Sequence, residues 1–318
     1  MHATHQKTEK TIDRQAIASF WAHERAALLS RNLSCVARRL VSSAKAPSRE
    51  TFVVTCMDER NTHIDEALGL HPGDAEIYAS GGGKIEAKTF EQVFRPAIDA
   101  ALAKGRPVSI FLVPHECSHA EHLGCAAFAN DREAQKVFFT DLKRALKERF
   151  PSVPVHVIAM CTTTHDFRAI DTDDHDDGLH AVLAANAKFD LEATDANHAG
   201  HGIYVGSAYR AWVQGRNAYF HLSAHNPSLA GNIEIALTVM EHHSDVDLAG
   251  KPIVLHADYP QYAEPARTAA AKENMDKAFA ELKENPAFKS KFDAGLLKIV
   301  RSETDMETWK GSLVGEVG

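Results

Sequence analysis

A cysteine, an aspartate and an arginine at alternate positions form the first group in the sequence that could carry out chemistry. Cys56, Asp58 and Arg60 follow residues 51–55, a short apolar segment typical of a β-strand. A thiolate can bind a transition metal, and an arginine can hold a nearby carboxylate ionised through charge-assisted hydrogen bonds. On this segment alone, a buried cysteine beside a surface ion pair is an equally good interpretation.

A second group of metal-binding side chains follows the continuous apolar run of residues 108–113. Three histidines and two cysteines lie close together there: His115, Cys117, His119, His122 and Cys125. Because the carboxyl ends of parallel strands meet at the same edge of a sheet, where ligands bind, this group and Cys56 can converge on one ion. Zinc favours a tetrahedral mixture of sulfur and nitrogen ligands, and three protein ligands leave a fourth position for water. The two groups together predict a catalytic zinc site.

Alternating strands and helices are expected to position these groups. The apolar patterns predict strands at residues 51–55, 75–79, 108–113 and 153–160, and helices at residues 11–43, 89–104 and 133–150. Strands that alternate with helices indicate an α/β fold with a mostly parallel sheet flanked by helices. The glycines at positions 81–83 predict a tight backbone turn near the site, since the Lys-Ser/Thr of a phosphate-binding loop is missing.

The second half of the chain repeats this order of elements. Residues 202–210 match residues 51–60, and later segments match in the same order, at 232–243, 251–256, 271–285 and 296–302. In this alignment Ser207 stands in place of Cys56 and Tyr209 in place of Asp58, so the second copy lacks the chemistry. We expect an internally duplicated chain, or pseudo-dimer, with three units: an N-terminal helical arm (1–48), a zinc-binding catalytic domain (49–190) and a degenerate repeat (191–318).

These motifs resemble those of the β-class carbonic anhydrases. That family has Cys-x-Asp-x-Arg after its first strand, a Gly-Asp strand with a glycine-rich turn, and a His and a Cys after a later strand. The corresponding residues here are Cys56-Met57-Asp58-Glu59-Arg60, Gly73-Asp74 leading to Gly81-Gly82-Gly83, and His115 with Cys125. The carboxysomal shell branch resembles the chain best, because it combines a long His-to-Cys spacing with an inactive duplicate. The Arg-Asn that precedes the glycines in the family is Ala79-Ser80 here.

The resemblance implies a carbonic anhydrase, a lyase that reversibly hydrates carbon dioxide to bicarbonate and a proton. Its Zn²⁺ would be held by Cys56, His115 and Cys125 and would lower the pKa of bound water to about 7, so that hydroxide attacks the substrate. Asp58 would orient this hydroxide, and Arg60 would hold Asp58 ionised and in place. The lost proton could reach solvent through one of three histidines: His63, His119 or His122.

Several alternatives stay open at this stage. His122 has the common family spacing to Cys125 and competes with His115 as the nitrogen ligand. Hydrolysis of carbon disulfide or carbonyl sulfide on the same zinc competes with hydration of carbon dioxide, and Asp58 could itself bind zinc in an inactive state. A metal-binding or shell-associated structural protein is the third alternative. The intact pair of Asp58 and Arg60 argues against it, since a structural zinc site needs no such pair.

Composition narrows the partners and the location. The net charge is −8 without an extended basic run, which argues against nucleic acid, and no apolar run approaches the length of a membrane-spanning helix. The polar N-terminus predicts no secretory signal, so we expect a cytoplasmic protein, or one inside a bacterial microcompartment, that acts on a small molecule as a homo-oligomer. Five cysteines argue against a disulfide framework, and Cys35 and Cys161 are predicted as buried thiols. Residues 171–178, an acidic run, are predicted as a solvated loop.

Overall fold

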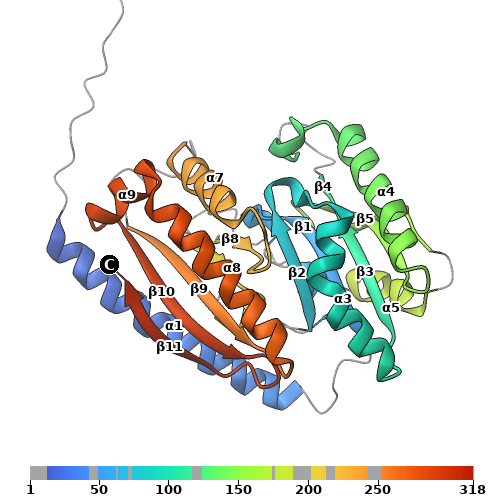
Figure 1. Cartoon of the computed structure of the whole chain (residues 1–318), viewed down its shortest axis with the longest axis horizontal. Helices are drawn as coiled ribbons and strands as arrows, with labels where there is room; N and C mark the ends of the chain where they lie inside the picture. Colours follow the sequence, from blue (N-terminus) through green and yellow to red (C-terminus); the bar gives the residue numbers. More distant parts are fainter. Residues whose placement is uncertain are drawn as a thin grey trace, which may run out of the picture.

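Two mostly parallel β-sheets, each flanked by helices, build the protein (Figure 1). The computed structural model describes the residues 13–42, 49–61, 64–70, 74–116, 124–173, 176–188, 202–212, 219–242 and 252–317. The predicted α/β class, with mostly parallel sheets between helices, is confirmed. None of the helices in this part of the chain is both long enough and apolar enough to cross a membrane.

The first sheet has the strand order β2-β1-β3-β5-β4, and β6 pairs antiparallel with β5. Its strands are β1 (Glu50–Cys56), β2 (Ala75–Ser80), β3 (Val108–Val113), β4 (His115–Glu116), β5 (Val155–Cys161) and β6 (Phe167–Asp171). The helices of this half are α2 (Ile64–Ala67), α3 (Ala87–Ala103), α4 (Arg132–Arg149) and α5 (Asp177–Asn186). Strand β3 is buried along its whole length, as its continuous apolar run requires of a central parallel strand.

The second sheet has the order β8-β7-β9-β10-β11, in which β11 pairs antiparallel with β10. Its strands are β7 (Gly202–Val205), β8 (Tyr219–Leu222), β9 (Ile253–Gln261), β10 (Leu297–Asp305) and β11 (Gly311–Val317). Its helices are α6 (Tyr209–Trp212), α7 (Leu229–His242), α8 (Pro265–Lys283) and α9 (Pro286–Asp293). In each sheet, the strand that comes first along the chain lies between the second and the third. Each sheet also has one antiparallel strand, β6 in the first and β11 in the second. This agrees with the predicted repeat, while a common origin by duplication and the three domain limits stay predictions.

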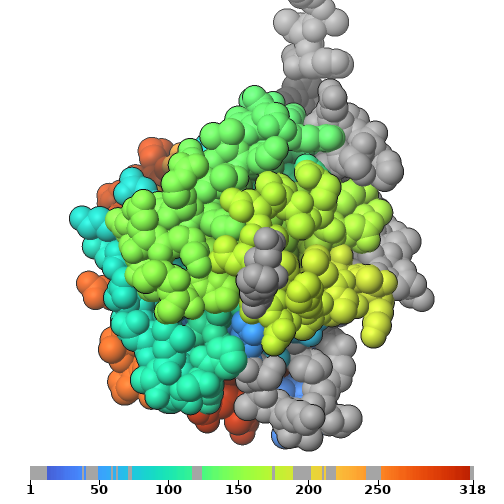
Figure 2. Space-filling model, turned by 90° about the vertical axis from the view of Figure 1, so that its right-hand side faces the viewer, coloured from blue at the N-terminus to red at the C-terminus, as the bar shows by residue number. Residues whose placement is uncertain are grey.

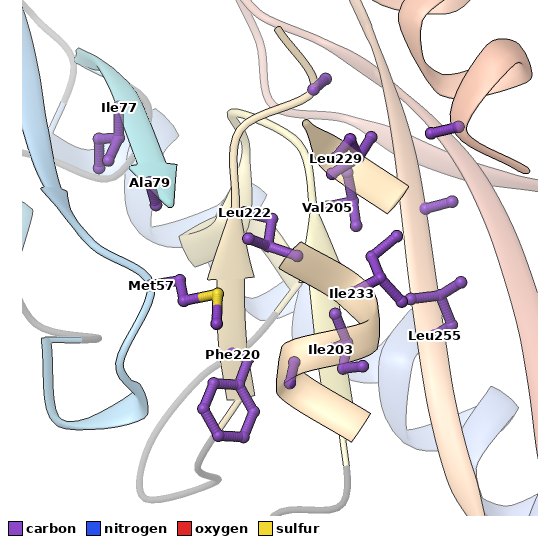
Figure 3. Packing of buried hydrophobic residues seen from close by; sticks show 14 of the residues in the cluster. Met57, Ile77, Ala79, Ile203, Val205, Phe220, Leu222, Leu229, Ile233 and Leu255 are labelled. Atoms are coloured by element: carbon purple, nitrogen blue, oxygen red, sulfur yellow. The ribbon is translucent and has the colours of Figure 1, made fainter. Parts of the chain in front are cut away.

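The two halves meet along the outer strands β2 and β8. The Ser223 N–H donates to the Ala79 carbonyl (3.4 Å), and the His221 N–H donates to the Met57 carbonyl (3.3 Å). Met57 points from the first half toward Leu222 and Phe220 of β8, and one buried apolar cluster extends through both halves (Figure 3). The carboxyl ends of β1 and β2 are thus packed against the second half.

The N-terminal helix α1 (Arg14–Ser42) packs mainly on the second half, and its Arg39 reaches Asp74 of the first half (3.3 Å). Leu28 is fully buried in a cluster that includes Trp212, and Asn32 Nδ2 donates to the carbonyls of Ala211 (2.9 Å) and Trp309 (3.0 Å). The Arg39 guanidinium lies 3.8 Å from the centroid of the Trp309 ring. The predicted helical arm is therefore a packing element of the second half.

Helices α3 and α4 cover one face of the first sheet. Phe90 and Phe94 of α3 and Phe139 of α4 are buried in one apolar cluster with Phe52 and Ile110 of the sheet. Seen from the side of the first half, the teal to yellow-green segments that run from α3 to α5 form most of the surface (Figure 2). The site described below lies at the carboxyl edge of this covered sheet.

The prediction of a solvated acidic loop at residues 171–178 is wrong for its described part. Asp176 is buried, and its Oδ2 accepts a hydrogen bond from Ser109 Oγ and lies 2.8 Å from His156 Nε2. Arg49 Nη1 lies 2.8 Å from the other oxygen of Asp176. Asp173 pairs with Lys143 (3.2 Å). Because these partners are distant in the sequence, the acidic composition of residues 171–178 did not reveal them and indicated a solvent-exposed loop instead.

Candidate metal centre

The three side chains predicted as zinc ligands lie together at the carboxyl edge of the first sheet. Cys56 is the last residue of β1, His115 begins β4 just past β3, and Cys125 directly precedes the short helix η4 (Ala126–Phe128). Their ligand atoms all lie within 4.8 Å of one another, and the three residues are between 1% and 8% exposed. The carboxyl ends of neighbouring parallel strands bring them together, as the sequence argument required.

The chemistry of this group fits a metal ion. The two sulfur atoms lie 4.0 Å apart, and neither cysteine is in a disulfide. Both ring nitrogens of His115 are buried, and neither forms a hydrogen bond within the described residues. Buried polar atoms rarely stay without a partner, because burial without a hydrogen bond or a ligand costs free energy. Two sulfurs and one nitrogen are a donor set that zinc prefers.

The two thiols differ in acidity, because the hydrogen bond between them lowers the pKa of Cys125 and raises that of Cys56. The neighbouring Cys125 thiol and burial raise the pKa of Cys56 well above its usual range. For His115, burial lowers the pKa, but the charges of Cys56 and Asp58 raise it more, so the net change is upward. A divalent cation competes with these protons, because only thiolate and neutral imidazole bind metals. Metal binding here is therefore expected to release protons.

Asp58 and Arg60 form a forked ion pair beside these ligands. The Arg60 backbone N–H and Nε donate to Asp58 Oδ1, both at 2.9 Å, and Nη2 donates to Oδ2 at 2.6 Å. Burial alone would raise the pKa of Asp58, but the Arg60 hydrogen bonds and the charges of His115 and Arg60 hold it well below its ordinary value. Asp58 Oδ2 lies 3.9 Å from His115 Nε2. An ionised carboxylate in a fixed orientation thus faces the nitrogen ligand.

A glycine turn closes over the sulfur of Cys56. The turn is the short helix η2 (Gly81–Gly83), and the Gly82 N–H donates to Cys56 Sγ at 3.3 Å. Gly82 has φ +71°, and a Cβ there would lie 2.7 Å from Ala127 Cβ in η4. Only glycine combines this left-handed conformation with such a close approach. The predicted tight turn beside the site is present, and it packs against the element that follows Cys125.

Some predicted residues lie outside the described part of the chain. These are the alternative ligand His122, the lower-ranked Cys117 and the proton-shuttle candidates His63, His119 and His122. Because the structure describes His115 but not His122, the choice between the two stays a prediction.

The two remaining cysteines differ from each other. Cys35 is buried in α1, as predicted, but Cys161 is partly exposed at the end of β5, so that prediction is wrong. Burial opposes ionisation of Cys161, yet hydrogen bonds from Thr163 and Thr164 lower its pKa to about 6. Its polar surroundings come from the turn after β5, whose fold the apolar run of that strand did not indicate.

Sequence reasoning missed one residue that contacts the site from the second half. Asn232 Oδ1, in α7, accepts a hydrogen bond from the Gly81 N–H at 2.6 Å. The two residues are 151 positions apart. An asparagine in a predicted helix gives no local signal of such a role, since the contact exists only once the two sheets pack together.

Comparison with known proteins gives short or weak matches. No family model matches the chain. A stretch of 37 residues is 54% identical to carbon disulfide hydrolase from Saccharolobus solfataricus, and 38 residues are 53% identical to carbon disulfide hydrolase from an Acidianus species. Each match spans 12% of this chain and 18% of the relative, far below the full length of these curated proteins.

Two solved structures of β-carbonic anhydrases resemble the chain at low identity. The enzyme from Trichomonas vaginalis has 17% identity and a TM-score of 0.30, over 51% of this chain and 99% of that one. The enzyme from Aspergillus fumigatus has 16% identity and a TM-score of 0.32, over 57% of this chain and 100% of that one. Scores this low do not establish a common fold, so the assignment of a function depends on the residues of the metal centre themselves.

Proposed function

We propose that this protein holds zinc on Cys56, His115 and Cys125 and reversibly hydrates carbon dioxide to bicarbonate and a proton, as β-class carbonic anhydrases do. The observation that carries the proposal is one arrangement: three donor atoms within 4.8 Å of one another, next to a carboxylate that Arg60 holds in a fork. A structural zinc site needs only the donors. The ionised Asp58, aimed at the same place, supports a site for chemistry.

The residues around the donors suit this reaction. Zinc, when bound, supplies a Lewis acid that makes water a nucleophile near neutral pH. A carboxylate offers about four acceptor positions, and Arg60 fills three of those on Asp58, two on Oδ1 and one on Oδ2. The remaining position is on Oδ2, the oxygen nearer to His115. At this position Asp58 accepts a hydrogen bond from the reacting water. The bond orients the water so that a lone pair of the water oxygen points toward the carbon of the substrate.

Arg60 has a positioning role in this scheme. Its fork fixes the plane of the carboxylate, and its charge keeps Asp58 ionised, so that Oδ2 remains an acceptor across the physiological pH range. An acceptor in a fixed orientation favours the attacking geometry without reorganisation during the reaction.

The short match to carbon disulfide hydrolases favours a second candidate, hydrolysis of carbon disulfide or carbonyl sulfide on the same site. Like carbon dioxide, these are linear molecules with an electrophilic central carbon. The same nucleophile and the same Asp58 acceptor would therefore serve. The two candidates differ in product, which is bicarbonate in one case and hydrogen sulfide in the other.

The second sheet, whose described residues form no cluster of metal donors, supports the carboxysomal shell branch as the nearest subgroup, with a cytoplasmic or microcompartment location and a homo-oligomer built from the two-half chain. Two measurements test this part of the proposal. Co-sedimentation with purified shells tests the location, and the mass of the protein in solution tests the homo-oligomer. A monomer that does not bind shells would remove this part of the proposal and leave the chemistry unaffected.

The test of function combines metal analysis with two substrate assays. The purified protein is expected to hold one zinc per chain and to hydrate carbon dioxide in a stopped-flow pH-indicator assay. Asp58→Asn is expected to keep the zinc and to lose roughly 100-fold in kcat, since it removes a positioned acceptor. The matched control is Asp141→Asn, which removes an exposed aspartate paired with Arg144 at 2.8 Å and is expected to leave kcat unchanged.

The same samples are assayed for hydrogen sulfide release from carbon disulfide. Sulfide release with no hydration of carbon dioxide would replace the first candidate by the second. Absence of zinc from protein that is folded and has been supplied with the metal would overturn both.

A further inference from the structure

The first turns of α7, in the second half, lie against the glycine turn that covers Cys56. Ile233 is fully buried in the apolar cluster that joins the halves, and Figure 3 shows it pointing toward the second sheet. Its neighbour Asn232 reaches the opposite way, to Gly81 of the first half. The core contact of Ile233 therefore fixes the position from which Asn232 acts.

Both ends of the Asn232 carboxamide are engaged. Nδ2 donates to the Ser228 carbonyl one turn earlier in α7 (2.9 Å), while Oδ1 accepts from the Gly81 N–H (2.6 Å). The side chain is only 7% exposed, so water does not compete freely for these bonds. This pair of bonds sets the amide orientation, because a flipped amide would present an N–H group to the Gly81 N–H.

Gly81, which Asn232 binds, is followed directly by Gly82, which forms a hydrogen bond to the metal centre. The Gly82 N–H, the next donor along the turn, is directed at Cys56 Sγ (3.3 Å). An N–H donor to a thiolate draws charge away from sulfur, which weakens its donation to a metal and leaves the ion a stronger Lewis acid. Glycines lack a side chain that would restrict their backbone, so something else must hold this turn in its orientation.

The strand before the turn is held from the same side. Asn226 Nδ2 donates to the Ala79 carbonyl (3.4 Å), and Tyr78 Oη donates to Asn226 Oδ1 (3.1 Å). The second half thus fixes the end of β2 through Asn226 and the turn through Asn232. Of these two contacts, only the one at Asn232 engages the turn that carries the donor to sulfur.

We infer that Asn232 is a positioning residue for the metal centre: from the half that holds none of the three proposed ligands, it orders the Gly81–Gly83 turn so that the Gly82 N–H donates to the Cys56 sulfur. The inference rests on the proposed function, because it concerns how that zinc site is tuned. It assigns the second half a part in the chemistry of the first.

The test uses the full-length protein with cobalt in place of zinc, because thiolate-to-cobalt charge transfer reports directly on sulfur donation. Asn232→Ala is expected to shift this near-ultraviolet band to lower energy, because the sulfur then keeps more charge to donate to the metal. Asn232→Asp keeps an oxygen acceptor for Gly81 and is expected to restore the band position. The matched control is Thr238→Ala, which removes a side-chain bond to the carbonyl one turn earlier in the same helix and is expected to leave the band unchanged.

A second measurement needs no metal. Hydrogen exchange of the peptide that contains Gly81 and Gly82 is expected to be faster in metal-free Asn232→Ala than in metal-free wild type, and unchanged in Thr238→Ala. Faster exchange with an unshifted cobalt band would overturn the role in the metal centre, and unchanged exchange would overturn the inference as a whole. A wild-type protein that binds no cobalt would instead overturn the proposed function, and the exchange result would then decide whether Asn232 orders the turn.

Discussion

The two halves of the molecule share a strand order and differ in the side chains at their strand ends. In the first half, Cys56 and His115 place donor atoms together, and the His115 nitrogens form no hydrogen bond within the described residues. In the second half, the corresponding region holds polar groups that bond to each other: Ser207 Oγ lies 2.9 Å from Tyr262 Oη, and Asp258 Oδ1 accepts a hydrogen bond from Ser302 Oγ at 2.6 Å. The same strand order thus carries two sulfurs and an imidazole within 4.8 Å of one another in the first half, and hydrogen-bonded hydroxyl and carboxyl groups in the second.

A similar contrast holds between one arginine–carboxylate pair beside the donors and another between the halves. Asp58 and Arg60 lie two residues apart beside the donors, and the pair orients an acceptor. Glu76 of β2 instead pairs with Arg267 of α8, across the boundary between the halves, and also accepts from Tyr262 Oη (3.1 Å). The first pair serves a reaction that we propose, while the second fastens the halves together.

The largest expected effect comes from exchanging corresponding strand-end residues. Cys56→Ser replaces a thiolate by a hydroxyl, a much weaker zinc ligand, and is expected to abolish stoichiometric zinc and reduce hydration of carbon dioxide to background. Ser207→Ala at the matching position is expected to keep both, because Ser207 makes only hydrogen bonds. Zinc content by mass spectrometry and stopped-flow rates check this pair. Loss of zinc in Ser207→Ala would show that the second half also contributes to binding.

Arginine replacements should separate activity from stability. Arg60→Gln is expected to lower kcat about 10-fold or more, because Asp58 loses its fork. Arg267→Gln leaves Glu76 in a largely buried site without its cation, since the two side chains are 17% and 13% exposed. It is expected to cost about 3 kcal/mol in stability and to leave kcat unchanged. Urea unfolding and stopped-flow assays measure the two quantities; similar effects of both variants would remove the contrast.

Asp258, buried in the second half, predicts a pH dependence of the free energy of unfolding. Burial raises its pKa to about 6, although Ser302 and Thr304 donate to it. The folded state therefore prefers the protonated acid, and the stability associated with it is present below the unfolded pKa of about 4 and lost as pH rises through 6. Asp258→Asn, which cannot ionise, should gain on the order of 2 kcal/mol over wild type between pH 4 and pH 7. Urea unfolding at these pH values checks this; a constant difference would contradict it.

Most of the fold could be predicted because its strands and helices carry strong local patterns. The continuous apolar run of β3 predicted the observed bounds of that strand, and the helical periodicity of α3 and α4 predicted their bounds to within two residues. Strand β8 was missed because its four residues, Tyr-Phe-His-Leu, show no strict alternation of apolar and polar side chains. Strand β11 was missed too: it is an outer strand with a weak apolar pattern, stabilised by pairing with β10.

The candidate site could be predicted where its residues follow strands directly. Cys56 and His115 stand at the ends of recognisable strands, so parallel topology alone brings them to one edge. The contacts made by Asn232 and Asp176 could not be predicted, because they depend on how α7 meets β2 and how α5 meets the first sheet. Tertiary packing fixes such partners, and their residue types are common in ordinary helices and caps.

The contact between β2 and β8 has a consequence for how the protein responds to dilution. Two separate subunits joined along such an edge would dissociate at low concentration, whereas one covalent chain holds the edges at an effective concentration on the order of millimolar. The metal centre is therefore expected to stay assembled at any cellular abundance. Because one apolar cluster extends through both halves, we also expect them to unfold in a single cooperative transition, so that zinc bound in one half stabilises the other.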